Sequence, residues 1–314
     1  MSTRMKNNKT VVILLSDKRS GSTMFQRELC KHREIQTVAY SPHTYLETHH
    51  WLKAAVMLDI DPSLFIGGKI YSGYGTQSNA RTYMEDCIRK NIPEFDCNCD
   101  DHDLIFKGWE ALCDRFTQPV FFEKSPQFLS HWGCLELMLQ WINQTDYQVK
   151  VIGLVRNPLS VLYSAQNLFH TDPQKRQYYW LETYKNLLRF QQQISPDNFL
   201  MCRYEEMIHQ PLQAFADVCH FIGVSDYHEI GAGTHTSSVK KWATDTYFTL
   251  QLADEVKTMA QRFGYTNDEL RNPVKSHPPL IYRINRNIEA SLKLLFARLK
   301  DRFIYPIILR NKNY

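Results

Sequence analysis

The pattern of apolar residues along the chain predicts four buried strands. Runs of β-branched, aliphatic and aromatic residues stand at 11–15, 120–122, 149–155 and 198–202. The runs at 11–15 and 149–155 are nearly continuous, which is typical of parallel strands that are covered on both faces. A helical pattern follows each of these two runs, which predicts βα units joined by right-handed crossovers. We therefore expect an α/β fold with a central parallel sheet flanked by helices.

Two further regions carry helical patterns. Residues 45–115 show helices and loops but no strong strand, which predicts an insertion over one edge of the sheet. Beyond residue 280, apolar residues recur at helical spacing among basic ones until Pro306 ends the pattern. We expect one domain over residues 1–280 and an amphipathic helical extension over 281–314. This extension would dock on the body or on the second copy of a homodimer, with contact to a membrane surface as the alternative.

The composition is that of an ordinary globular protein. The 314 residues are 43% hydrophobic and 22% charged, with a net charge of +4. These values exclude a disordered tail, a collagen-like repeat and a mainly membrane-embedded chain, and the charge is too weak to predict a nucleic-acid partner. From Arg271 onward, ten basic residues face two acidic ones, so this part carries +8 and the remainder −4. Binding of an anion therefore has to come from individually placed groups.

The cysteines indicate the compartment. All eight are scattered along the chain, many beside apolar residues, as is typical of buried free thiols. The first ten residues are polar and show no secretory leader, so we expect a cytoplasmic protein. The densest group, with Cys97, Cys99 and His102, lacks the paired C-x-x-C spacing of a zinc site. It predicts a polar loop, and we expect no metal.

The most informative segment follows the first strand. Residues 16–25 read Ser-Asp-Lys-Arg-Ser-Gly-Ser-Thr-Met-Phe. A small-residue loop that enters a helix points backbone N–H groups and the positive helix end at an anion. Against the pattern G-x-x-x-x-G-K-[ST], Ser22 stands in place of the lysine, and the positive charge has moved to Lys18 and Arg19. Because a nucleoside-triphosphate enzyme needs that lysine, the loop favours a single 5′-phosphate that carries the charge of a leaving group.

A second motif stands at the end of the 149–155 strand. Arg156 leaves the sheet at its carboxyl edge, where ligands bind in open α/β folds. Pro158 is well placed at a first helical position, and Ser164 lies two turns further on, where it can face the same side as Arg156. The pair can grip one phosphate from two directions, with a surface ion pair as the alternative for Arg156. Two anion sites on one sheet fit a ligand that is phosphorylated at both ends.

These two motifs resemble those of sulfotransferases that use 3′-phosphoadenosine-5′-phosphosulfate (PAPS). The loop at 19–23 is similar to the family's 5′-phosphosulfate loop, in the arginine form of the carbohydrate and bacterial branches, and the spacing of Arg156, Pro158 and Ser164 is similar to its 3′-phosphate motif. The resemblance implies a P-loop-like sulfotransferase fold, PAPS as co-substrate, adenosine 3′,5′-bisphosphate as product and no required metal. The donor contacts that it implies here are Lys18, Arg19, Ser20, Gly21, Ser22, Thr23, Met24, Arg156 and Ser164.

Three later segments extend the resemblance as far as about residue 265. The run at 123–126 is similar to a heparan-type segment whose lysine neutralises the oxygen between sulfur and phosphate, a role that falls to Lys124 unless it is a solvated surface lysine. The strand that ends near residue 203 places Tyr204 by the nucleotide base, or in the core as an ordinary aromatic. The stretch at 237–242 resembles the loop that closes over the nucleotide, which adds Lys240, Lys241 and Trp242.

Sulfuryl transfer needs in-line positioning and stabilisation of charge. By resemblance, Arg19 and Lys124 would hold the charge that develops on the departing phosphate. A base must take the proton of the acceptor. The histidine of the phenol and steroid branch is Pro126 here, and Ser41 stands at the position of the heparan-type glutamate. We predict His43 as the base, with Glu47 next and another group left open.

We therefore expect a PAPS-dependent sulfotransferase that acts on a hydroxyl or amine of a small molecule, a glycolipid or a natural product. A P-loop kinase or NTPase of small metabolites is one alternative, and an inactive nucleotide-binding scaffold is another. We expect residues 45–115 and a loop at 166–180, rich in tyrosine and glutamine, to shape the acceptor pocket.

Overall fold

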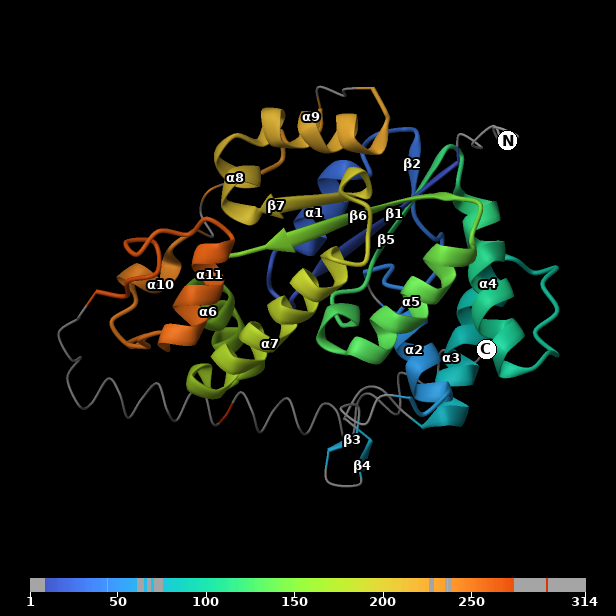
Figure 1. Cartoon of the computed structure of the whole chain (residues 1–314), viewed down its shortest axis with the longest axis horizontal. Helices are drawn as coiled ribbons and strands as arrows, with labels where there is room; N and C mark the ends of the chain where they lie inside the picture. The colour runs from blue at the N-terminus through green and yellow to red at the C-terminus, as the bar shows by residue number, and fades with distance from the viewer. Residues whose placement is uncertain are drawn as a thin grey trace.

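A parallel sheet of five strands forms the centre of the computed structural model, which describes residues 9–43, 45–60, 65–66, 69–70, 76–225, 229–234, 236, 239–273 and 292 (Figure 1). The strand order is β2-β5-β1-β6-β7, and every neighbouring pair is parallel. The strands are β2 (Ile35–Gln36), β5 (Val120–Lys124), β1 (Thr10–Ser16), β6 (Gln148–Val155) and β7 (Phe199–Arg203). The α/β fold and all four predicted strands are confirmed.

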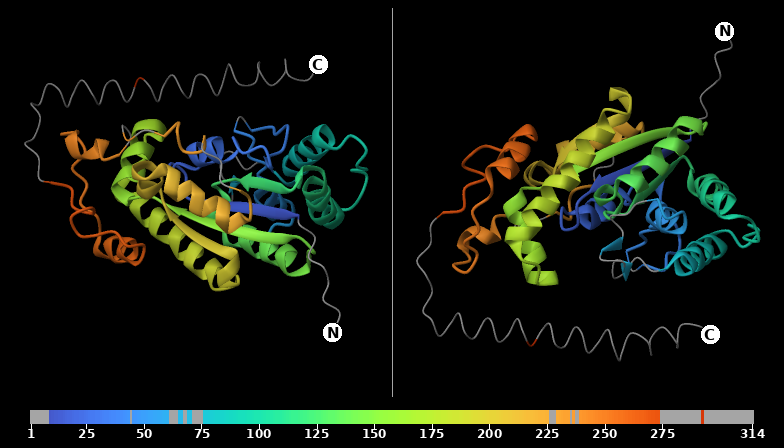
Figure 2. Two further views of the ribbon diagram at one scale, coloured as in Figure 1. Left: turned by 90° about the horizontal axis from the view of Figure 1, so that it is seen from above. Right: turned by 60° about the horizontal axis from the view of Figure 1, so that its bottom comes forward.

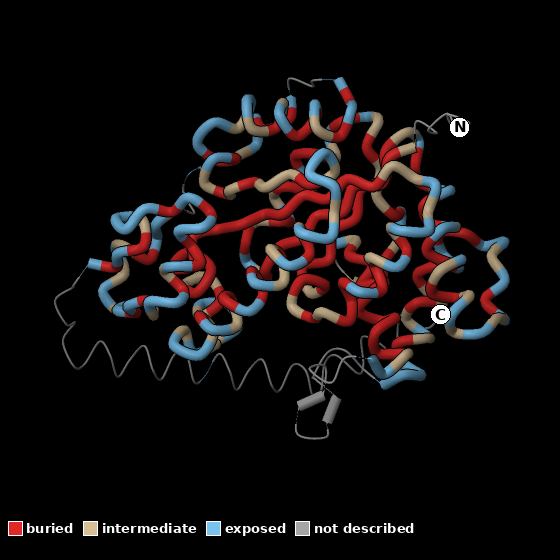
Figure 3. Tube along the Cα trace, in the orientation of Figure 1, coloured by how far each residue is buried: buried red, intermediate tan, exposed pale blue. Residues whose placement is uncertain are grey.

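Strand β1 runs through the middle of the sheet and is buried along its whole length (Figure 3). Its residues alternate between two apolar cores, with Val11 and Ile13 in one and Val12 and Leu14 in the other. This explains the unbroken apolar run in the sequence. Strand β2 and the antiparallel hairpin of β3 (Phe65–Ile66) and β4 (Lys69–Ile70) were not expected, because strands of two residues leave no recognisable pattern.

Helices cover both faces of the sheet (Figures 1 and 2). One core contains residues of α1 (Ser22–Leu29), α8 (Tyr204–His209) and α9 (Pro211–Ile222). The other core is larger and contains residues of α2 (His50–Met57), α3 (Gln77–Asn91), α4 (Asp101–Phe116), α5 (Trp132–Gln144), α6 (Pro158–Phe169), α7 (Pro173–Gln191), α10 (Lys241–Thr244) and α11 (Asp254–Arg262), with the 3₁₀ turn η2 (Phe128–Ser130). A second turn, η3 (Pro196–Asn198), leads into β7.

Residues 45–115 connect β2 to its parallel neighbour β5, and their helices do more than cover an edge. All eight residues of α2 are buried. Trp51 of α2 packs against Trp109 of α4 and Trp141 of α5, with ring centroids 5.3 and 6.0 Å away. The segment is therefore part of the main core. The group with Cys97, Cys99 and His102 leads into α4, where the Asp100 carboxylate caps the helix by accepting from the Asp103 N–H. All eight cysteines are free thiols, as predicted.

The expectation of a loop at 166–180 is wrong. Residues 166–169 complete α6, and α7 begins at Pro173 behind a cap in which the Asp172 side chain accepts from the Gln174 N–H. Trp180 is fully buried, with its ring 4.6 Å from that of Tyr184. The predicted extension over 281–314 lies outside the described residues apart from Leu292. Within the described part of the chain, every helix is too short or too polar to cross a bilayer.

Candidate active site

The loop between β1 and α1 is shaped by two residues with positive φ. Arg19 has φ 72° and Gly21 has φ 94°. A left-handed conformation at a non-glycine residue is strained and persists only where its surroundings hold it. Here the Ser20 hydroxyl turns inward to lie 3.0 Å from the hydroxyl oxygen of Tyr184, which donates to the Leu154 carbonyl at 3.1 Å. The loop is thus held by Tyr184 of helix α7, which is itself bonded to strand β6.

A buried ion pair supports the same loop. An Nη2 nitrogen of Arg176, from α7, lies 2.6 Å from both carboxylate oxygens of Asp17, whose side chain is inaccessible to solvent. Buried carboxylates require such a partner, because an unpaired charge in the interior is costly. Sequence analysis missed this pair, since the two residues are 159 positions apart and no motif links them.

A cavity of about 480 Å³ opens at the carboxyl edge of the sheet, beside the start of α1. Four of its lining residues are cationic, and none of the described residues that line it is acidic. Such a lining favours an anionic ligand, and the N-terminus of α1 adds its partial positive charge. The lining consists of Arg19, Gly21, Ser22, Thr23, Met24, Arg27, Arg156, Ser160, Tyr163, Ser164, Asn167, Tyr204, Ile208, Lys241 and Trp242.

The two sequence motifs meet in this cavity. Arg156 Nη1 donates to the Arg19 carbonyl at 3.0 Å, and Arg19 Nε donates to Ser164 Oγ at 3.0 Å. The Arg156 guanidinium also lies 4.2 Å from the centre of the Tyr204 ring. Arg156 is buried rather than a surface ion-pair residue. The side chains expected to hold two separate anionic groups therefore line one continuous space.

Ten of the thirteen predicted donor contacts line the cavity, and Lys18, Ser20 and Lys240 do not. Ser20 is buried beneath the loop, and Lys240 is exposed at the start of α10. Lys18 lies on the other side of the loop, where it interacts with the charges of Asp17 and Glu47. Sequence analysis missed the lining residues Arg27, Ser160, Tyr163, Asn167 and Ile208. Ser160 could have been predicted, because it lies one helical turn before Ser164.

Gly21 offers a direct test of this architecture. A Cβ atom at residue 21 would lie 2.2 Å from Tyr204 Cε2, on a backbone with φ 94°. We expect Gly21→Ala to lower the free energy of unfolding by about 1–3 kcal/mol through ring displacement and backbone strain. Gly223→Ala is the matched control, because Gly223 also has positive φ (83°) but nothing lies within 4 Å of its added Cβ. Equal destabilisation of both variants in urea unfolding would contradict the predicted ring clash.

A second cluster adjoins the loop on its other side. Lys124, at the end of β5, is 1% exposed, so it is not a solvated surface lysine. Its Nζ lies 2.6 Å from Glu47 Oε1 and 3.5 Å from Thr23 Oγ1. Glu47 Oε2 lies 3.0 Å from His49 Nε2 and 3.4 Å from His43 Nδ1. The structure thus brings the predicted His43, Glu47 and Lys124 together and adds a buried His49.

The charges in this cluster follow from burial and pairing. Burial would raise the pKa of Glu47, but the hydrogen bond from His49 and the charge of Lys124 outweigh it and lower that pKa to about 2. Burial lowers the pKa of His49 to about 4 despite the opposing effect of Glu47. Burial also lowers the pKa of His43, which Glu47 again opposes. At neutral pH, Glu47 and Lys124 therefore form an ion pair beside two neutral imidazoles.

Among the described residues, His43, Glu47 and His49 form the one group whose ligand atoms are close enough to share a metal ion, all within 4.8 Å of one another. The Lys124 ammonium already occupies Glu47 Oε1 at 2.6 Å, and its charge repels a cation. These groups are better suited to proton transfer, and His43 is the most accessible of the three, with 33% of its side chain exposed.

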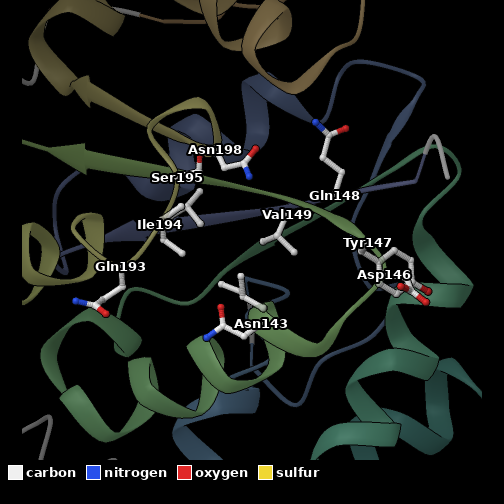
Figure 4. Close-up of a pocket in the computed structure, with 11 residues that line it drawn as sticks. Asn143, Asp146, Tyr147, Gln148, Val149, Gln193, Ile194, Ser195 and Asn198 are labelled. Carbon is white, nitrogen blue, oxygen red and sulfur yellow. The ribbon is translucent and has the colours of Figure 1, made fainter. Parts of the chain in front are cut away.

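A cavity of about 230 Å³ lies at the opposite edge of the sheet, where β6 begins (Figure 4). Side chains from the end of α5, from the segment after α7 and from the start of β6 surround it, including Asn143, Val149 and Ile194. Its described lining is rich in amides but contains no lysine, arginine or histidine. It therefore lacks groups that attract an anion, and the larger cavity is the candidate active site.

Comparison with known proteins agrees with this fold. Residues 12–229 match the model of a family described as the sulfotransferase family. Similar solved structures include the sulfotransferase domain of the Synechococcus PCC 7002 olefin synthase (20% identity, TM-score 0.55, 85% of this chain and 98% of that one) and the sulfotransferase domain from the curacin biosynthetic pathway (20% identity, TM-score 0.54, 82% and 98%). Curated proteins give no match. Since the family match spans more than half of the chain, this protein belongs to the sulfotransferase family.

Proposed function

We propose that this protein transfers a sulfuryl group from PAPS to a hydroxyl or amine of a small molecule, a glycolipid or a natural product. The observation that carries the proposal is the continuous cavity in which the Arg19 loop and the Arg156–Ser164 pair meet, with four cationic residues and no acidic one in its described lining. A donor with phosphate at both its 3′ and 5′ positions matches this distribution of charge.

We assign the lining residues to the two phosphorylated ends of the donor. Arg156, Ser164 and Lys241 would hold the 3′-phosphate, while Arg19, Thr23 and the α1 N-terminus would face the 5′-phosphosulfate. When bound, PAPS supplies the sulfuryl group and a phosphate leaving group. Arg19 and Lys124 would stabilise the charge on that phosphate. A kinase function is disfavoured because Ser22 stands where the phosphate-binding lysine would be.

On the acceptor side, His43 would accept the proton of the attacking group. Its imidazole is neutral at neutral pH, and the imidazolium that forms would be stabilised by the Glu47 carboxylate, 3.4 Å from Nδ1. Glu47 itself is a weak base while Lys124 and His49 hold its pKa near 2. Glu47 therefore suits the role of a charged support for His43.

One exposed aromatic side chain lies beside His43, with its ring 5.9 Å from the imidazole, and another lies beside Arg19. The Tyr45 ring, 55% exposed, lies 5.6 Å from Lys124 Nζ, and the Phe169 ring, 49% exposed, lies 5.9 Å from the Arg19 guanidinium. An acceptor that reaches His43 past Tyr45 would meet aromatic surface beside its reacting group. This favours an acceptor with an apolar body, such as a glycolipid or a natural product, over a free sugar.

Calorimetry tests the donor, with adenosine 3′,5′-bisphosphate compared with ATP and Mg²⁺. We expect tight, metal-independent binding of the bisphosphate and weaker binding of ATP. Preference for ATP would favour a kinase.

A panel of acceptors incubated with PAPS, read by mass spectrometry, then tests turnover. Binding of the bisphosphate without sulfation of any acceptor would favour an inactive scaffold.

Arg156→Lys tests the 3′-phosphate end. Lysine keeps the charge but loses the planar fork and the stacking on Tyr204. We expect roughly tenfold weaker binding of adenosine 3′,5′-bisphosphate by calorimetry. Adenosine 5′-phosphate is the control ligand, and its affinity should change much less. An equal loss of affinity for both ligands would show that Arg156 does not contact the 3′-phosphate.

A further inference from the structure

The turn at residues 46–49, here named the Glu47 turn, is strained on both sides of its carboxylate. Leu46 has φ 54° and His49 has φ 52°. Each is a non-glycine residue in the left-handed region of φ/ψ space. This conformation costs free energy, and it persists only when the surroundings impose it. Specific contacts must therefore hold the turn in this conformation. We refer to the groups that make these contacts as the anchor.

The anchor is the end of β5. Glu123 Oε1 accepts from the Thr48 hydroxyl at 2.9 Å, from the Thr48 N–H at 3.3 Å and from the Ser125 hydroxyl at 2.5 Å. Ser125 Oγ in turn accepts from the His49 N–H at 3.1 Å, and Thr48 Oγ1 accepts from the His50 N–H at 3.2 Å. Each of the two hydroxyls thus donates once and accepts once.

This network is closed to water. Thr48 is 2% exposed, Glu123 is 1% exposed and Ser125 is inaccessible. Hydrogen bonds in such surroundings are strong, and losing one partner leaves a buried polar group unsatisfied. Lys124 stands between Glu123 and Ser125 in the chain, so one strand end carries both the lysine and the two groups that hold its partner Glu47.

We infer that Thr48, Glu123 and Ser125 are positioning residues that set Glu47 against Lys124 and His43. The inference rests on the proposed function for its catalytic meaning but not for its geometry. Without the anchor, the strained turn relaxes, Glu47 leaves its place beside His43, and buried His49 gains access to solvent. The donor cavity is unaffected, because none of the three residues lines it.

The test compares Thr48→Val with Thr48→Ser. Valine keeps the shape but removes the hydroxyl, whereas serine retains it. We expect Thr48→Val to lower kcat roughly tenfold, while the affinity for adenosine 3′,5′-bisphosphate stays within about threefold. Thr48→Ser should recover most of the lost turnover. Thr117→Val is the matched control, because Thr117 is equally buried and its hydroxyl donates to the Cys113 carbonyl at the far end of α4.

NMR titration of the histidines gives a readout that needs no turnover. In Thr48→Val, the pKa of His49 should rise from about 4 towards its usual 6.5, whereas in Thr117→Val it should not move. Unchanged kcat and an unchanged His49 titration in Thr48→Val would overturn the inference, as would equal losses of kcat in both valine variants. A shifted His49 titration in a protein that sulfates no acceptor would support the positioning role and reject the proposed function.

Discussion

Lys124→Met is expected to abolish most of the activity and to destabilise the fold at the same time. The Lys124 ammonium would stabilise the departing phosphate, and removing one such group costs about 10²–10³ in kcat. Methionine fills the space of the lysine stem but leaves the Glu47 carboxylate, 5% exposed, without its 2.6 Å partner. Breaking a buried pair in this way costs about 3–5 kcal/mol of stability. Steady-state kinetics and urea unfolding measure the two effects.

The double variant Lys124→Met/Glu47→Gln separates the two effects. Neutral glutamine removes the unpaired charge, so we expect most of the stability to return while the activity stays low. If the double variant were as unstable as the single one, the ion pair would not be the source of the loss. If Lys124→Met kept turnover near that of the parent protein, the proposed role of Lys124 in charge stabilisation would be wrong.

His43→Ala is expected to lower kcat by about 10²–10⁴, the range for loss of a general base, with little change in the affinity for adenosine 3′,5′-bisphosphate. The pH profile of the parent protein gives an independent check. The base must be neutral to accept a proton, and burial lowers the pKa of His43 from its usual 6.5. We therefore expect kcat/KM to be level at neutral pH and to fall only below that usual value, as His43 becomes protonated.

His49→Ala serves as the comparison for His43→Ala. His49 contacts the same Glu47 oxygen but is largely buried, with 10% of its side chain exposed against 33% for His43. A larger loss of turnover in His49→Ala than in His43→Ala would show that His49, and not His43, is the base. A profile that rises only above pH 8 would point to a base other than either histidine.

The sheet and the loop at 19–23 could be predicted because short-range features of the sequence determine them. The apolar run at 11–15 has no polar residue, which requires cover on both faces, and the 19–23 loop carries its small residues and its arginine in sequence. Pro158 begins α6 as its ring geometry predicts, and Ser164 of this helix lines the same cavity as Arg156. For these elements, short-range chemistry determines the structure.

The remainder of the site depends on contacts between distant residues. Asp17 meets Arg176 across 159 positions, and Glu47 meets Lys124 across 77. His49 was not among the predicted site residues, because sequence alone does not show that the turn before α2 is buried. Residues 166–180 contain many polar side chains, which suggested a loop, yet the apolar face of α7 packs into the core. In each case the structure depends on tertiary packing, which the local composition of the sequence does not determine.

The strand order has a consequence for how the protein folds. Arg19 reaches Ser164 across 145 residues and Arg156 across 137, because β1 lies between strands that follow it much later in the chain. Such contacts form late, since long loops must close first, and parallel sheets of this kind fold slowly. We therefore expect the two ends of the proposed donor site to come together only late in folding. A nucleotide bound at the proposed site would therefore stabilise the native domain as a whole, and we expect its effect on the melting temperature to report complete assembly of the sheet.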